Sequence, residues 1–161
     1  MPDFFFVPRL NSLIGLISIL HMNKACPIIL RKIGDELEIL AFEHPLAGNQ
    51  LVKGSIEKDE LLADACIREL VEESGLAARP HSFLGVWNAN FDNQEWGFYV
   101  MEYDGVLPDS WVFHTADDGG HVFKFFWQPL NQNLDGNWHL LFGGAVDFIR
   151  QALIANKLIV R

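Results

Sequence analysis

Basic residues are scarce in this sequence of 161 residues. It has 12 Lys or Arg against 21 Asp or Glu, a formal net charge of −9, and no run of basic residues. A surface with this charge repels the phosphate backbone of a long nucleic acid. Small phosphorylated ligands stay open, because a bound divalent cation reverses the sign of the local field. The charge therefore argues against long nucleic acids as partners and leaves small phosphorylated ligands as candidates.

Cysteine is rarer still. Cys26 and Cys66 are the two cysteines of the chain, too few and too far apart for a disulfide framework or a CxxC metal site. A reducing, cytoplasmic setting is therefore the expected one.

Long apolar runs are also missing. The run from Leu13 to Leu20 is interrupted by Gly15 and Ser18 and is too short to span a bilayer. It has neither the basic start nor the small-residue cleavage site of a signal peptide. No membrane partner is expected, although a membrane or partner contact through this segment is an alternative. Residues 1–21 are interpreted either as an arm packed on the domain or, preferably, as an extension upstream of a start at Met22.

Residues 22–161 have the composition of one compact domain, since half of the chain is apolar and 12% is aromatic. Apolar or alternating segments predict strands, with the first two and the next two forming hairpins: residues 24–32, 37–43, 83–91, 98–103 and 122–130. Turn-forming residues predict loops at 44–50 and 104–121, and 139–159 predicts a closing helix. Strands mixed with helices indicate an α/β or α+β layered domain.

A second helix is predicted from about Glu60 to Ser74. Asp59 is a suitable N-cap, and Gly75 is suited to the left-handed conformation that ends many helices. At 3.6 residues per turn, Glu69 and Glu73 lie on the same stripe as the apolar residues of the helix.

The carboxylates of this helix have little basic charge nearby, because Arg68 is the one basic residue between Glu60 and Leu76. Like charges at i, i+4 repel, and an unpaired carboxylate is costly to bury. An acidic, solvated helix face is one interpretation. The other is a site for Mg²⁺ or Mn²⁺, ions that prefer oxygen ligands. The residues alone leave the two interpretations about equal.

The spacing of the stretch distinguishes them. Gly54 is followed after five residues by Glu60, and after seven more by "RELVEESGL" at 68–76. This pattern matches every fixed position of the Nudix box, GX5EX7REUXEEXGU, in which U is a bulky aliphatic residue. The chain thus resembles the Nudix hydrolase (MutT-like) superfamily. The resemblance implies a mixed β-sheet sandwiched between helices, and Mg²⁺-dependent cleavage of a diphosphate linkage in a small nucleoside diphosphate derivative or nucleoside triphosphate.

The resemblance also implies roles for the residues of the box. Glu69 and Glu73 would be the principal Mg²⁺ ligands, Glu72 would join them or bind a further ion, and a carbonyl at Lys53–Gly54 would contribute a ligand. Arg68 and Glu60 would orient these carboxylates through a salt bridge. A non-catalytic, nucleotide-sensing Nudix module is the alternative function, but such modules typically lose box glutamates and none is lost here. A homodimer is left open.

The general base is not fixed in this family, and the candidates outside the box are Glu95, Glu102, Asp117 and Asp118. Glu102 lies in a strand pattern in which it could face inward, whereas the two aspartates are interpreted first as turn residues. Trp87 and Trp96 are considered as a base-stacking platform, although tryptophan is more often a core residue. The residues after the box, "WNANFDNQ", have neither the proline of ADP-ribose hydrolases nor the tyrosine of dinucleoside polyphosphate hydrolases, so the sequence selects no substrate.

Overall fold

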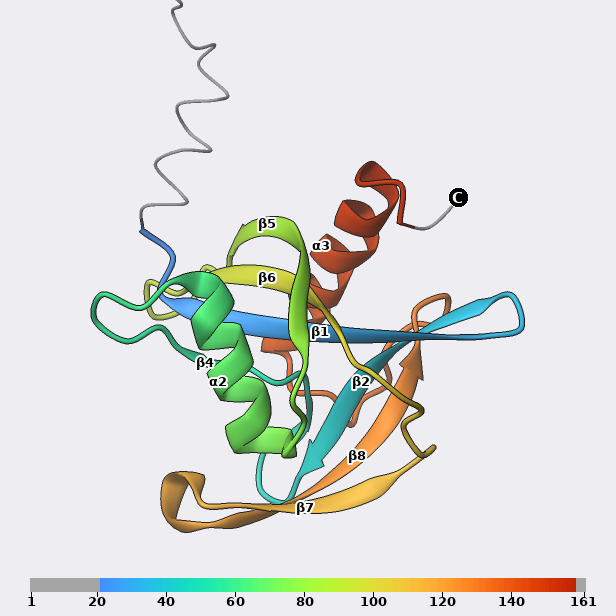
Figure 1. Ribbon diagram of the computed structural model, residues 1–161, viewed down its shortest axis with the longest axis horizontal. Coiled ribbons are helices and arrows are strands. Elements are labelled where there is room, and N and C mark those ends of the chain that lie inside the picture. Colours follow the sequence, from blue (N-terminus) through green and yellow to red (C-terminus); the bar gives the residue numbers. More distant parts are fainter. Residues whose placement is uncertain (1–20, 159–161) are drawn as a thin grey trace, which may run out of the picture.

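The computed structural model describes residues 21–158 and shows one mixed sheet with a helix on each face (Figure 1). The strands are β1 (Lys24–Ile33), β2 (Glu36–His44), β3 (Gly48–Gln50), β4 (Gly54–Ser55), β5 (Arg79–Asn88), β6 (Glu95–Glu102), β7 (Trp111–Thr115) and β8 (His121–Pro129). The helices are α2 (Leu62–Ser74) and α3 (Leu141–Ala155), with a 3-10 turn η1 (Asp117–Gly119) between β7 and β8. The expected α+β fold, with a sheet between helices, is confirmed.

The long strand β1 joins two halves of the sheet. The strand order is β5-β6-β1-β2-β8-β7, with β3 beside β2 and β4 beside β1. Residues 24–29 of β1 run parallel to residues 96–101 of β6, whereas residues 30–33 pair antiparallel with β2. Because β1 changes partner along its length, the sheet divides beyond Ile29.

Alternation along β1 separates two apolar cores, since successive side chains of a strand point to opposite faces. Ala25 and Ile29 belong to the core under α2, and Cys26 and Ile28 belong to the core under α3. In Figure 1, α2 (green) and α3 (red) accordingly lie on opposite sides of the sheet. Each helix therefore has a core of its own, and β4 and the loop before it lie beside α2.

Both predicted hairpins are present, β1–β2 and β5–β6, and the predicted strand at 122–130 and closing helix are confirmed as β8 and α3. The expected loop at 104–121 is wrong in part, because β7 lies inside it and pairs with β8. Packing explains this strand among turn formers: the Trp111 ring stacks on Phe125 at 4.9 Å. The expected loop at 44–50 likewise contains β3.

The N-terminal segment predicted as an arm or extension lies almost wholly outside the described residues. Among those that are described, no helix is long and apolar enough to cross a membrane.

Candidate functional site

The acidic helix α2 begins two residues later than the sequence predicted. Leu61 is the N-cap residue, and Asp59 has a φ of 62° in the preceding turn. The prediction of Asp59 as N-cap is therefore wrong. The turn is closed by Glu60, whose backbone N–H donates to the Glu57 carbonyl at 3.1 Å and whose carboxylate accepts from the Glu57 N–H at 2.9 Å.

The end of α2 agrees with the prediction. Gly75 has a φ of 74°, and its N–H donates to the Val71 carbonyl at 2.9 Å, which is the left-handed helix end that glycine favours. The Thr115 hydroxyl donates to the Glu72 carbonyl at 3.0 Å. The last turn of α2 is thus attached to the end of β7, and this contact positions the η1 loop that follows.

Glu69 is the most buried carboxylate of the helix, with 5% of its surface exposed. It shares the inward face with the core residues Leu62, Cys66 and Leu70, as the helical spacing predicted. Gly54 faces it from β4: a Cβ added at Gly54 would lie 1.8 Å from the Glu69 carboxyl carbon. The glycine is needed here because it has no side chain, which leaves the space that the carboxylate fills.

Arg68 connects most of the carboxylates of the predicted site. Its guanidinium donates to both oxygens of Glu60 at 2.8 Å, to Glu69 at 2.7 Å and to Glu72 at 3.2 Å. A further bond at 2.9 Å goes to the Ser55 carbonyl beside Gly54. The hydrogen bonds from Arg68 lower the pKa of Glu60 to about 2. Arg68 therefore fixes the direction of the Glu69 carboxylate and ties α2 to β4.

Glu73 lies on the same side and is not in contact with Arg68. Its carboxylate accepts a hydrogen bond from the backbone N–H of Lys53 at 3.2 Å. Burial raises the pKa of Glu73 to about 8, and the charge of Glu69 acts in the same direction. Burial also raises the pKa of Glu69, against the opposing effect of Arg68. Two neighbouring carboxyl groups therefore resist ionisation in the metal-free protein.

Asp117 completes a cluster of three acids. One carboxylate oxygen from each of Glu69, Glu73 and Asp117 lies within 4.8 Å of the others. Oxygen donors of this kind suit a divalent cation, and a cation would relieve the repulsion that raises the pKa of Glu73. The residues present therefore fit a bound Mg²⁺ or Mn²⁺, with Glu72 at the edge of the cluster.

The interpretation of Asp117 as a turn residue alone is therefore incomplete. Asp117 does begin the η1 turn, and its N–H donates to the Thr115 hydroxyl at 3.2 Å. That same hydroxyl is bonded to α2, so the turn is held beside the helix with the Asp117 side chain in the cluster. The sequence signal was an acid before Gly119-Gly120, but the contact itself depends on the pairing of β7 with β8.

Two of the other candidate bases, Glu102 and Glu95, lie outside the acidic cluster. Glu102 is exposed and forms an ion pair with Arg79 at 3.1 Å, so it does not face inward, as its strand pattern would have allowed. Glu95 has one buried carboxylate oxygen without a hydrogen-bond partner, but it is outside the acidic cluster. Asp118 lies in the η1 turn.

The proposed tryptophan platform is not exposed. Trp96 is fully buried, and the half-buried Trp87 meets it edge to face, with ring centroids 5.2 Å apart. A stacking base would need an open ring face, so the core interpretation of Trp96 is the correct one.

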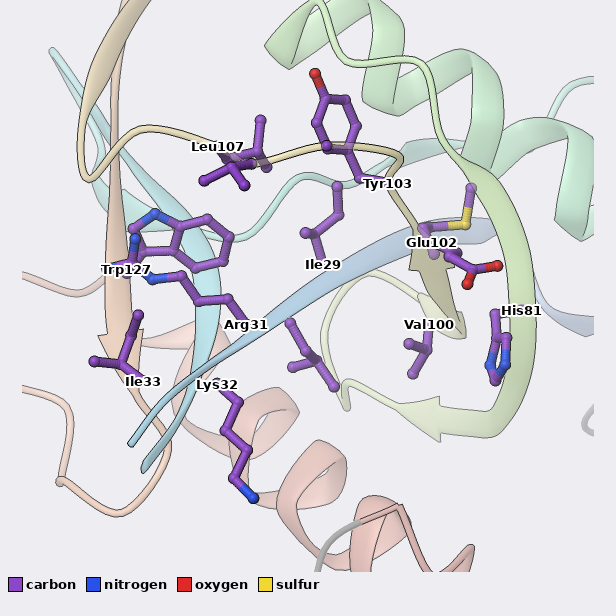
Figure 2. Close-up of a pocket in the computed structure, with 14 residues that line it drawn as sticks. Ile29, Arg31, Lys32, Ile33, His81, Val100, Glu102, Tyr103, Leu107 and Trp127 are labelled. Carbon is purple, nitrogen blue, oxygen red and sulfur yellow. The ribbon is translucent and has the colours of Figure 1, made fainter. Parts of the chain in front are cut away.

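A cavity of about 470 Å³ lies where β1 separates from β6 (Figure 2). The Arg31 guanidinium carbon lies 4.4 Å from the ring centroid of Trp127. Figure 2 shows these two side chains next to each other and Tyr103 apart from them in the lining of the cavity. No residue of the acidic cluster lines it. The cavity and the cluster are therefore separate features.

Comparison with known proteins places this geometry in a family. A family model described as NUDIX domain matches residues 24–147. No curated protein matches the chain. An ADP-ribose pyrophosphatase from Streptococcus suis 89-1591 is similar in structure, with a TM-score of 0.58, 16% sequence identity, and coverage of 83% of this chain and 90% of that chain. A MutT protein from Methanosarcina mazei Go1 has a TM-score of 0.57 and 20% identity, with coverage of 83% of this chain and 94% of that chain. A Nudix hydrolase from M. smegmatis has a TM-score of 0.55 and 16% identity, with coverage of 84% of this chain and 88% of that chain. At these identities the likeness shows the fold.

Proposed function

Since the chain belongs to the NUDIX domain family, whose model matches most of its length, we propose that it is a metal-dependent hydrolase of phosphorus-containing anhydrides. Its substrate class is a small nucleoside diphosphate derivative or a nucleoside triphosphate. The observation that carries the proposal is the cluster of Glu69, Glu73 and Asp117, which brings acidic oxygens of the box helix α2 together with one from the η1 turn. The similar structure described as an ADP-ribose pyrophosphatase agrees with this reaction class.

Glu69 and Glu73 would hold Mg²⁺, with Mn²⁺ as a substitute, together with a carbonyl of the Lys53–Gly54 segment; Glu72 would join them or hold a further ion. When bound, the metal supplies charge neutralisation on the diphosphate and lowers the pKa of a bound water. Arg68, itself held by Glu60, keeps the Glu69 carboxylate in one orientation, and such outer contacts preserve ligand geometry.

Asp117 is proposed as the general base. Among the candidates outside the box whose side chains the structure describes, it is the one found in the acidic cluster. It is half-buried and lies on a loop rather than on α2, so it can accept a proton while Glu69 and Glu73 hold the metal. Proton acceptance by a carboxylate next to the nucleophile is ordinary general-base catalysis.

The test is a substrate panel with Mg²⁺ or Mn²⁺, comprising nucleotide sugars, ADP-ribose, dinucleoside polyphosphates, capped RNA and (d)NTPs. We expect metal-dependent cleavage of at least one class, its loss in Glu73→Gln, and unchanged activity in the control Glu102→Gln. Asp117→Asn should lower kcat about 10²-fold or more and leave the Kd for Mn²⁺ within about threefold. A weaker Kd would instead make Asp117 a ligand. Nucleotide binding without cleavage by the wild-type protein would support the sensing module and contradict the proposal.

A further inference from the structure

The backbone of Lys53 contacts the acidic cluster, whereas its side chain contacts other residues. The Lys53 N–H donates to Glu73 at 3.2 Å, whereas its ammonium lies 4.6 Å from the ring centroid of Trp96 and 3.5 Å from the side-chain oxygen of Gln94. Among the described residues, no carboxylate oxygen lies within 4.0 Å of this ammonium. The charge is thus held by an aromatic ring and an amide instead of an ion pair.

The two groups that hold the ammonium are themselves fixed. Trp96 is fully buried, and its indole N–H donates to the same Gln94 oxygen at 2.9 Å. Gln94 is buried and closes the β5–β6 turn through backbone bonds to Phe91 and Ala89, at 2.9 and 3.0 Å. The Lys53 side chain therefore links the segment before β4 to a rigid part of the neighbouring hairpin.

We propose that Lys53 is a positioning residue whose ammonium, docked on Trp96 and Gln94, holds the Lys53–Gly54 peptide against Glu73 and Glu69. This inference rests on the proposed function, because the peptide held in this way is the one assigned to the metal site. Residues 51–53 are not part of a strand. The two glutamates are contacted by Lys53, whose N–H bonds to Glu73, and by Gly54, the first residue of β4, which faces Glu69. A cation on an indole face is an attractive contact, and here it favours one position of this short segment.

A positioning role and a purely electrostatic role give opposite results for metal binding. The negative charges of Glu73 and Glu69 favour the charged form of Lys53. The ammonium would therefore repel a cation bound by these two glutamates. On charge alone, removing the ammonium would tighten metal binding. If the side chain instead holds the loop in place, removing it weakens metal binding, because the ligands are no longer preorganised.

The experiment measures the Kd for Mn²⁺ by electron paramagnetic resonance in four proteins: wild type, Lys53→Met, Lys53→Arg and the control Lys124→Met. Lys124 is exposed and lies 3.8 Å from Glu43 on the β2–β8 pair. We expect Lys53→Met to weaken Mn²⁺ binding about tenfold, the size typical of contacts behind a metal ligand. Lys53→Arg should recover most of the affinity, since a guanidinium also stacks on indole, and Lys124→Met should match wild type.

Unchanged or tighter Mn²⁺ binding in Lys53→Met overturns the inference, as does a wild-type protein that binds no Mn²⁺. A rise in KM with unchanged kcat and unchanged Kd for Mn²⁺ also overturns it, because that result would make Lys53 a substrate contact. If Lys53→Met unfolds, Lys53→Gln takes its place, because it also removes the charge, and unchanged or tighter Mn²⁺ binding in that variant overturns the inference. Wild-type protein that binds Mn²⁺ but cleaves no substrate contradicts the proposed hydrolase alone, because the Kd values still test the role of Lys53.

Discussion

The raised pKa of Glu73 predicts that the metal-free protein loses stability as the pH rises. The folded-state pKa of about 8 exceeds the ordinary value of 4.5, so the folded state binds a proton that the unfolded state releases at lower pH. The resulting stabilisation is complete below about pH 4.5 and is lost as the pH rises through about 8. Glu69, whose pKa is also raised, acts in the same direction.

The magnitude follows from the pKa difference. At about 1.4 kcal/mol per pKa unit, a change from 4.5 to about 8 corresponds to roughly 5 kcal/mol. Glu73 is only partly buried, and solvent screening and local relaxation reduce the effect. We therefore expect the free energy of unfolding to fall by about 2–3 kcal/mol between about pH 5 and about pH 9.

The assay is urea unfolding in a chelator across this pH range, for wild type, Glu73→Gln and the exposed control Glu102→Gln. Glutamine imitates the protonated acid, so Glu73→Gln should match wild type at low pH and exceed its stability by about 2–3 kcal/mol at high pH. Mg²⁺ at about 100 times its Kd should add about 2.7 kcal/mol to wild type at high pH, and less at low pH, where the proton competes. A wild-type stability that is constant or rises with pH, or an equal slope in Glu73→Gln, would refute the reasoning.

Three further substitutions test the framework around the cluster. Arg68→Met should cost about 2 kcal/mol of stability in chemical denaturation and weaken Mn²⁺ binding at least tenfold by titration, whereas Arg79→Met on the exposed side should not change Mn²⁺ binding. Gly54→Ala should push the Glu69 carboxylate out of the place where Arg68 holds it, and so weaken Mn²⁺ binding about tenfold or more and lower the melting temperature. Gly75→Ala would place a side chain at a positive φ and 2.6 Å from a phenyl ring. It should lower the free energy of unfolding by about 2 kcal/mol. Gly136→Ala, whose added Cβ would have no neighbour within 4 Å, is the control and should be neutral in thermal unfolding.

The sequence predicted the box helix well because its signals are local. The stripe of Glu69 and Glu73 depends only on helical spacing, and the αL end at Gly75 depends on one residue type. The start of the helix was wrong for a reason that spacing does not show. The Glu60 carboxylate is engaged by Arg68 and by the Glu57 N–H, and this closes a separate turn before Leu61.

Contacts across the sheet could not be predicted in this way. Asp117 reaches the cluster because β7 pairs with β8 and Thr115 bonds to the end of α2, and β7 itself was hidden among turn-forming residues. The contact of Lys53 with Trp96 similarly depends on β4 and β6 lying on either side of β1. A single sequence contains the residues of such contacts but not the pairing that brings them together.

The charges around α2 explain why this helix departs from ordinary design. Helices usually pair their glutamates with basic residues at i+3 or i+4, yet Arg68 is shared among Glu60, Glu69 and Glu72. Within residues 21–158, Glu73 has no cationic partner within 4.0 Å. The lack of positive charge destabilises this part of α2. The burial of the apolar face of the helix and its attachment to β7 offset that cost. Departures from local rules that persist in a folded domain are expected at functional sites. A divalent cation is the simplest species that would remove this cost, because its preference for oxygen ligands matches Glu69 and Glu73 and its charge also offsets that of the neighbouring Asp117.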